Sequence, residues 1–197
     1  LLKARYGLGY AYFNLKQYDR ALFSFKEFVN KSPRTQLNLS DGILRLADCY
    51  YISKSYPEAL VNYRRATQMA SPDADYAHLH AGIILGIMSK YSEAIAELDK
   101  VIKDYPKSGL YDEALFSKAQ LDFEQGNYPQ AVESYSKLVQ DNPASRYAPY
   151  AYTRRAASYY NLKAFDKTVQ DYITVIENYP NHPAGSDIIL QLQEALN

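Results

Sequence analysis

The 197-residue sequence contains one cysteine, Cys49, no tryptophan, and only 8 glycines and 9 prolines. A single cysteine excludes an internal disulfide framework, and we expect Cys49 to be a small buried residue. The low glycine and proline content, together with 47% hydrophobic residues, excludes the composition of a disordered chain. Because no run of about 18 apolar residues occurs, the sequence predicts no direct membrane insertion.

Positive charge is not in excess, because 22 Lys and Arg residues balance 22 Asp and Glu residues. A general nucleic-acid binder needs spare cations to neutralise phosphates, so the sequence predicts no nucleic-acid partner. Basic residues outnumber acidic ones by 14 to 10 up to Lys103, and acidic residues outnumber basic ones by 12 to 8 beyond it. Because the two parts of the chain differ in the sign of their charge, copies of it could attract one another, and the sequence does not exclude a homo-oligomer.

Residues that could carry catalysis are scarce as well. The three histidines are His78, His80 and His182. Residues two apart on a helix point to different sides, so His78 and His80 cannot share a metal ion, and we expect His78 to pack between helices. No glycine-rich phosphate loop, His-Glu-x-x-His segment or nucleophile turn occurs. The sequence therefore predicts no enzyme, no catalytic residue, no metal site and no cofactor.

What the sequence does contain is an internal repeat of 35 to 38 residues. Similar segments begin at Tyr18, Tyr56, Tyr91, Tyr128 and Phe165. Small residues recur with the same spacing at Gly9, Ala47, Gly82, Ala119 and Ala156. The units end at Pro33, Ser71, Pro106, Pro143 and Pro180. Within each unit apolar residues recur at helical spacing in two stretches, and the small residue allows the paired backbones to approach closely. One period therefore predicts one helix pair.

The period predicts an all-α solenoid of about five antiparallel helix pairs in a single domain, 1–197. The repeats span about 2–34, 40–72, 75–107, 112–144 and 149–181, with pairs opening near Leu2, Ser40, Asp73, Ser108 and Pro149. The segments 55–58 and 127–130 have the pattern of a capping box, and Gly126 is placed to end a helix. Residues 184–197 predict a terminal capping helix, or alternatively the first helix of a truncated sixth repeat.

This arrangement of small, aromatic, alanine and proline residues resembles the tetratricopeptide repeat (TPR) family over about residues 4 to 180. In the first unit the residues that carry the resemblance are Gly9, Tyr12, Ala21, Phe25 and Pro33. The fifth unit departs from the pattern, because Thr168 replaces the alanine of the other units. The resemblance implies a right-handed superhelical solenoid whose function is protein binding.

The repeat units are longer than the 34 residues usual in that family. Together with the junctions Asp104–Ser108 and Glu177–Asn181, this length resembles bacterial cell-envelope members of the outer-membrane assembly lipoprotein and Tol-Pal-associated types. That resemblance implies a periplasmic or outer-membrane-associated location rather than a cytoplasmic one.

In a stacked solenoid the first helix of every unit lines the concave side, which predicts an aromatic groove there. The candidate partner-binding residues are Tyr6, Tyr10, Phe13, Arg45, Asp48, Tyr51, Tyr76, His80, Phe116, Gln120, Phe123, Tyr150, Arg154 and Tyr160. Tyr and Arg side chains often dominate binding energy at interfaces, so we expect a scaffold that binds an extended peptide or a helix of a protein partner. The alternatives are an architectural segment of a larger multi-repeat protein with a self-filled groove and, less favoured because of the zero net charge, an RNA-binding helical repeat.

Overall fold

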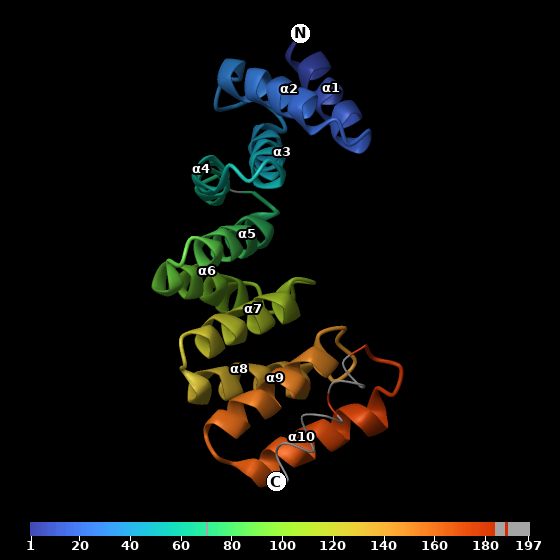
Figure 1. Cartoon of the computed structure of the whole chain (residues 1–197). Coiled ribbons are helices and arrows are strands. Elements are labelled where there is room, and N and C mark those ends of the chain that lie inside the picture. The colour runs from blue at the N-terminus through green and yellow to red at the C-terminus, as the bar shows by residue number, and fades with distance from the viewer. Residues whose placement is uncertain (70, 184–187, 189–197) are drawn as a thin grey trace. The chain divides into compact units, whose positions relative to one another are not determined.

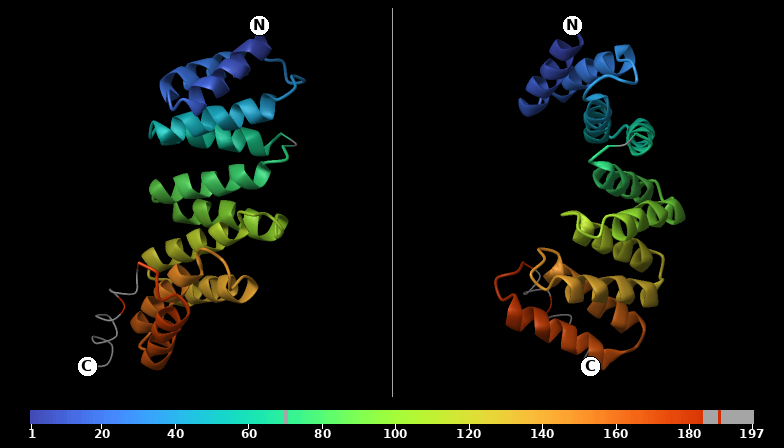
Figure 2. Two further views of the ribbon diagram at one scale, coloured as in Figure 1. Left: turned by 90° about the vertical axis from the view of Figure 1, so that its right-hand side faces the viewer. Right: turned by 180° about the vertical axis from the view of Figure 1, so that it is seen from behind.

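The computed structural model describes residues 1–69, 71–183 and 188, and every regular element in these ranges is a helix (Figure 1). The ten described helices are α1 (Leu2–Asn14), α2 (Tyr18–Lys31), α3 (Leu39–Ile52), α4 (Tyr56–Thr67), α5 (Ala74–Ile87), α6 (Tyr91–Asp104), α7 (Tyr111–Glu124), α8 (Tyr128–Asp141), α9 (Ala148–Asn161) and α10 (Phe165–Asn178). They form antiparallel pairs (Figure 2), which confirms the predicted all-α class. The predicted terminal helix 184–197 lies outside the described residues apart from Ile188.

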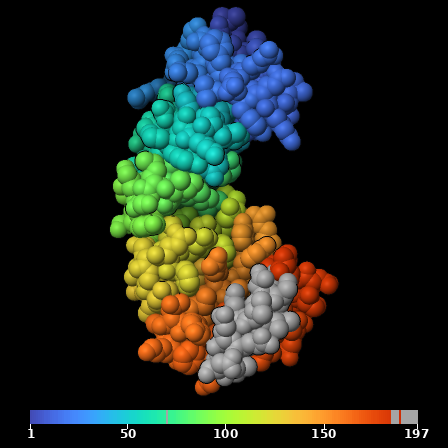
Figure 3. All heavy atoms as spheres, viewed as in Figure 1, coloured from blue at the N-terminus to red at the C-terminus, as the bar shows by residue number. Residues whose placement is uncertain are grey.

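The chain divides into two compact units, Leu1–Lys100 and Val101–Asn197, and α6 spans the division. In the first unit the helices pack in chain order from α1 to α5, so α1 and α2 form one end of this unit (Figure 3). In the second unit α8 packs between α7 and α9, and α10 packs on α9. The predicted single domain and its repeat boundaries stay predictions.

The first helices of the pairs begin at Leu2, Leu39, Ala74, Tyr111 and Ala148. These starts lie within three residues of the predicted ones, and the largest difference is at α7. There the Ser108 hydroxyl accepts a hydrogen bond from the amide of Leu110 at 3.0 Å, and the Ser108 carbonyl accepts one from the amide of Tyr111 at 3.1 Å. Ser108 therefore belongs to a turn that precedes the helix.

Close approach between paired helices depends on the small residue predicted for each unit. A Cβ atom added to Gly9 would lie 2.7 Å from the ring of Phe25, and one added to Gly82 would lie 2.8 Å from Leu98. The alanines at this position, Ala47, Ala119 and Ala156, are fully buried. The side chain of the second helix thus occupies the space that a larger residue would need.

The turns inside the pairs share a left-handed residue at one register position. These residues are Lys16, Lys54, Ser89, Gly126 and Lys163, with φ between 58° and 75°. In the fourth pair the amide of Gly126 donates to the carbonyl of Phe123 at 3.0 Å, and the amide of Asn127 donates to that of Asp122 at 2.8 Å. This is the Schellman pattern of a helix end, and it confirms Gly126 as a C-terminal cap.

The capping boxes predicted at Ser55 and Asn127 are wrong. Both residues stand at the N-cap, and Pro57 and Pro129 lie in the first turns as expected, but neither N-cap side chain makes a capping hydrogen bond. A capping box needs the N-cap amide as a donor to the acidic residue three positions on. The Ser55 amide instead donates to the carbonyl of Tyr50 at 2.9 Å to close the preceding turn.

Candidate protein-interaction surface

A carboxylate on α3 joins the first two helix pairs. The hydroxyl groups of Tyr6 and Tyr10 both donate to Oδ2 of Asp41, at 2.6 and 2.7 Å. Burial and this hydrogen bond raise the pKa of Tyr6 to about 12, and the same causes raise the pKa of Tyr10. Both tyrosines are therefore uncharged donors that lock α1 to α3.

A second carboxylate, Asp48, plays the same role two turns further along α3. Its side chain is buried, and Oδ1 accepts hydrogen bonds from Tyr63 at 2.6 Å and from Tyr76 at 3.0 Å. Arg45 binds Oδ2 of Asp48, and its Nε lies 3.6 Å from Oδ1 of Asp41. The guanidinium thus neutralises the buried carboxylate of Asp48 and the half-buried carboxylate of Asp41. Without this charge, removing the two carboxylates from water would cost more free energy.

The first-unit network comprises Tyr6, Tyr10, Asp41, Arg45, Asp48, Tyr63 and Tyr76. His80 extends it, because its ring lies 4.2 Å from that of Tyr76 and stacks on Tyr63 at 5.4 Å between ring centroids. Sequence reasoning missed Asp41 and Tyr63, which supply an acceptor and a donor. The available signal was the spacing of Asp41 and Arg45, four residues apart on one helix.

Four of the predicted aromatic residues lie at the turns of their own helix pairs. The ring pairs are Phe13 with Tyr18 at 5.4 Å, Tyr51 with Tyr56 at 6.0 Å, Phe123 with Tyr128 at 5.4 Å, and Tyr160 with Phe165 at 5.5 Å. Each pair joins the last turn of a first helix to the first residue of the second helix. These contacts hold the two helices of each pair together at their turn. Of the four residues, only Tyr51 also contacts the first-unit network, since its ring centroid lies 5.8 Å from that of His80.

The second unit places Phe116 among tyrosines of the neighbouring helices. Its ring lies 5.4 Å from that of Tyr147, 5.7 Å from that of Tyr135 and 6.3 Å from that of Tyr150. Tyr150 is 46% exposed, although its ring also meets that of His182 at 4.4 Å. The α7 and α9 surfaces thus meet through aromatic contacts that remain partly open to solvent.

Tyr135 occupies in the fourth repeat the register position that Tyr63 occupies in the second. It is fully buried, and its hydroxyl has no hydrogen-bond partner among the residues that the structure describes. The position of Asp48, the acceptor of Tyr63, is held here by Gln120, whose amide donates to Glu124 at 3.2 Å instead. A buried hydroxyl without a partner costs free energy, so this position is not optimised for stability.

A cation lies beside this hydroxyl. Burial raises the pKa of Tyr135, and the nearby guanidinium of Arg154 opposes the rise. Arg154 is exposed, lies over the ring of Phe123 at 5.8 Å, and forms no ion pair within the described ranges of the chain. We define the second-unit cluster as Phe116, Gln120, Tyr135, Tyr150 and Arg154. In contrast to the first-unit network, it offers hydrogen-bond donors that the described part of the chain does not use.

The residues predicted to be structural lie in the core. Cys49 is fully buried, and burial raises the pKa of its thiol to about 12. His78 is buried on α5, with Nδ1 2.7 Å from Oε2 of Glu97. Within the described residues no group of three His, Cys, Asp or Glu side chains could hold a metal ion, and no described helix is long and apolar enough to cross a membrane.

Comparison with known proteins agrees with this repeat architecture. The tetratricopeptide repeat family matches residues 3–35, 88–149 and 116–183. The chain belongs to the tetratricopeptide repeat family. The match names no cell-envelope subtype, so the predicted likeness to outer-membrane lipoproteins and Tol-Pal-associated proteins gains no support from it.

Among curated relatives, this TPR chain is 22% identical to a TPR repeat-containing protein of Methanocaldococcus jannaschii, over 95% of the chain and 34% of the relative. The chain thus spans about a third of the length of that relative. A TPR protein structure from Parabacteroides merdae superposes with a TM-score of 0.82 at 15% identity, covering 99% of this chain and 73% of the other. YrrB, described as a TPR protein with an unusual peptide-binding site, gives a TM-score of 0.75 at 13% identity, over 96% and 90% of the two chains.

Proposed function

We propose that this TPR chain is a protein-interaction scaffold and that the second-unit cluster binds an extended peptide of a protein partner. The observation that carries the proposal is the hydroxyl of Tyr135, which is buried beside an exposed Arg154 and has no partner among the described residues. A peptide that brings a hydrogen-bond acceptor would satisfy this donor and remove the cost of leaving it unpaired. YrrB, which has the same fold, is described as having a peptide-binding site.

An extended peptide suits this cluster better than a helix does. In an extended segment the backbone carbonyls are unpaired and point sideways, whereas the carbonyls of a helix are used within the helix. Tyr135 would donate to such a carbonyl as Tyr63 donates to Asp48, and Gln120, at the register position of Asp48, is bonded to the exposed Glu124. Arg154 would pair with a carboxylate of the peptide, and Tyr150 would cover an apolar side chain.

The first unit supports a second candidate function, an architectural segment of a larger multi-repeat protein. There the hydroxyls of Tyr6, Tyr10 and Tyr63 are all satisfied within the network. A surface whose hydrogen-bond donors are already bonded within the protein gains little binding free energy from a ligand. We therefore assign the first-unit network to holding successive helix pairs together.

Selection from a library of random peptides displayed on phage tests the proposed function. We expect a family of sequences with a shared acidic residue to be enriched on the protein. The double variant Tyr150→Ala with Arg154→Ala should bind the selected peptide at least about tenfold more weakly in calorimetry, because it loses the ring and the cation of the site.

Arg65→Ala on α4 is the matched control, since Arg65 is also an exposed arginine but lies on a second helix. It should bind the peptide like the parent protein. Failure to enrich any peptide family, or equal affinity of the parent and the double variant, would leave the architectural function as the better account.

The periplasmic or outer-membrane-associated location stays a prediction from the length of the repeats and their junctions. Fractionation of the source cells, followed by detection of the protein with an antibody, checks it. Recovery with the periplasmic or outer-membrane fraction is the expected result, and recovery with the cytoplasmic fraction contradicts it.

A further inference from the structure

In the first unit, successive first helices meet through one tyrosine and one aspartate at two fixed positions of the repeat. Between α1 and α3 the hydroxyl of Tyr10 donates to Asp41 at 2.7 Å. Between α3 and α5 the roles are exchanged, because the hydroxyl of Tyr76 donates to Asp48 at 3.0 Å. Tyr10 and Asp48 share one register position, and Asp41 and Tyr76 share the other. At both interfaces the aspartate supplies the acceptor that the tyrosine needs.

The second unit repeats this pairing without the aspartate. On α7 and α9 the two positions hold Gln120 and Tyr150. The side-chain amide of Gln120 donates to Glu124 on its own helix at 3.2 Å, and the hydroxyl of Tyr150 makes no hydrogen bond within the described residues. The tyrosine is thus kept at this interface, whereas the carboxylate that would accept from it is not.

The buried tyrosine of the second helix lacks the same acceptor. In the second repeat Oδ1 of Asp48 accepts hydrogen bonds from Tyr63 and from the tyrosine of α5, so one oxygen satisfies two hydroxyl groups. Tyr135 and Tyr150 are the register equivalents of these tyrosines, and both rings contact that of Phe116, at 5.7 and 6.3 Å between centroids. One missing oxygen therefore leaves two hydroxyl groups without an acceptor among the described residues.

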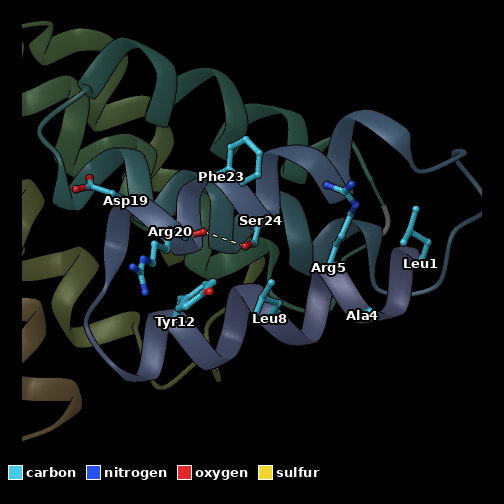
Figure 4. Close-up of a pocket in the computed structure, with 9 residues that line it drawn as sticks. All are labelled: Leu1, Ala4, Arg5, Leu8, Tyr12, Asp19, Arg20, Phe23 and Ser24. Atoms are coloured by element: carbon cyan, nitrogen blue, oxygen red, sulfur yellow. Dashed lines mark hydrogen bonds between the residues drawn. The ribbon is translucent and has the colours of Figure 1, made fainter.

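A tyrosine at the position of Tyr135 cannot satisfy its hydroxyl within its own helix. Figure 4 shows how a short side chain does so in α2, where the hydroxyl of the buried Ser24 donates to the carbonyl of Arg20 at 2.9 Å. Phe25, which follows Ser24, is the register equivalent of Tyr135. A hydroxyl at the far end of that ring lies beyond the carbonyls of its own helix, so its acceptor must come from another helix or from a ligand.

We infer that Gln120 is the residue that keeps the fourth repeat open to a ligand, and that one backbone carbonyl of the bound peptide takes the place of the Asp48 carboxylate. The inference rests on the proposed function, because the peptide is the ligand. A carbonyl oxygen has two lone pairs, so it accepts from Tyr135 and Tyr150 together. A carboxylate at position 120 would fill the same place and exclude the peptide.

Two substitutions would rebuild the first-unit arrangement in the fourth repeat. In the first unit Arg45 neutralises Asp48 and also lies close to a second carboxylate. Ser117 and Glu113 stand at the positions of Arg45 and that second carboxylate. The protein with Ser117→Arg and Gln120→Asp, which we call the closed variant, therefore has a carboxylate for both tyrosines and a cation to neutralise it.

We expect the closed variant to bind the selected peptide at least about tenfold more weakly than the parent in calorimetry, because its own carboxylate occupies both donors. Ser117→Arg alone is the matched control. It carries the added cation but keeps Gln120, so it should bind the peptide at least as tightly as the parent. Gln120→Asp alone, with the nearby Arg154 as its cation, repeats the test if the closed variant does not fold.

Tyr135→Phe gives a second readout that needs no ligand. In the parent it removes a hydroxyl without a partner among the described residues, so the folding equilibrium constant should not fall. In the closed variant the same change removes a donor to the introduced carboxylate, so the constant should fall about tenfold. Urea denaturation of the four proteins measures this coupling, whereas a general effect of the two substitutions on the fold would be the same in both backgrounds.

Two results would overturn the inference. They are equal peptide affinity of the closed variant and the parent, and an equal effect of Tyr135→Phe on folding in both backgrounds. If no peptide family is selected on the parent, the proposed function fails by itself, and the denaturation experiment alone then decides whether Gln120 leaves the acceptor position empty.

Discussion

Glu97 lies buried between three basic side chains of the first unit. Its carboxylate is 2.7 Å from His78, 3.2 Å from Lys100 and 3.5 Å from Arg64. Burial would raise the pKa of Glu97, but hydrogen bonds from His78 and Lys100 lower it to about 2. The folded protein thus favours the ionised form more strongly than the unfolded chain does.

The stability of the protein should therefore depend on pH through Glu97. Because the pKa falls from 4.5 in the unfolded chain to about 2 on folding, the contribution is complete above about pH 4.5 and is lost as the pH falls towards 2. Glu97→Gln should lower the free energy of unfolding by about 1–2 kcal/mol at neutral pH and flatten its change over that window. Chemical denaturation at a series of pH values measures both effects.

Glu93→Gln is the control for this prediction, since Glu93 also pairs with Arg64 but is exposed to solvent. It should change the unfolding free energy far less. An unchanged pH profile in Glu97→Gln would show that the carboxylate contributes no linked stability.

At the residue scale, the small residues between paired helices could be predicted, but the polar network could not. Gly9 and Gly82 stand at the same position of the 35- to 38-residue repeat, so periodicity alone placed them between helices. Asp41 accepts a hydrogen bond from Tyr6 of the preceding helix pair, and Tyr63 donates one to Asp48 on the other helix of its own pair. Such contacts depend on the rotation of one helix against another, which periodicity does not specify.

At the element scale, one backbone conformation ends the first helix of every pair. The left-handed residue is Gly126 in the fourth pair and Lys163 in the fifth, with φ of 75° and 58°. An L-residue with a Cβ atom pays a steric cost in this region, and glycine does not. Gly126 has nothing within 4 Å of the position a Cβ would take, so only this backbone cost would change on substitution.

Gly126→Ala should therefore lower the free energy of unfolding by about 1 kcal/mol. Lys163→Gly should raise it by about 0.5 kcal/mol, because the steric gain exceeds the added entropy of the unfolded chain. Urea denaturation of both variants measures the difference. Equal stability of Gly126→Ala and the parent would mean that this turn does not hold a left-handed residue in solution.

The number and type of the described helices followed from the sequence, and so did the C-terminal cap at Gly126, whereas the N-terminal capping did not. The pattern at Ser55 predicted a capping box from local residues alone. The amide that this box needs is already used, because Ser55 follows the left-handed Lys54 and donates to Tyr50. The turn that ends one helix thus decides how the next one begins, two residues later.

At the scale of the whole molecule, one fold gives its two units different surfaces. The sequence placed Tyr10 and Tyr150 in one predicted groove, since both stand on first helices. In the structure Tyr10 is held by Asp41 and Tyr150 remains 46% exposed. The buried tyrosines differ as well, because Asp48 accepts from Tyr63 whereas Gln120 stands at the equivalent position in the fourth repeat, beside Tyr135. A single exchange of this kind leaves the repeat pattern intact.

The two equivalent tyrosines allow the same one-oxygen change to be made in both units. Tyr63→Phe removes a donor from the buried Asp48, so it should lower the free energy of unfolding by about 1–2 kcal/mol and leave affinity for a selected peptide unchanged. Tyr135→Phe removes a hydroxyl without a partner among the described residues, so it should not lower stability.

Calorimetry of the selected peptide with Tyr135→Phe is thus the most direct test of the account. We expect the Tyr135→Phe protein to bind the peptide about fivefold to tenfold more weakly than the parent, because one hydrogen bond is lost. Its free energy of unfolding should be equal to or above that of the parent. Unchanged peptide affinity together with a loss of stability would contradict it, because the hydroxyl of Tyr135 would then serve the fold and not a partner.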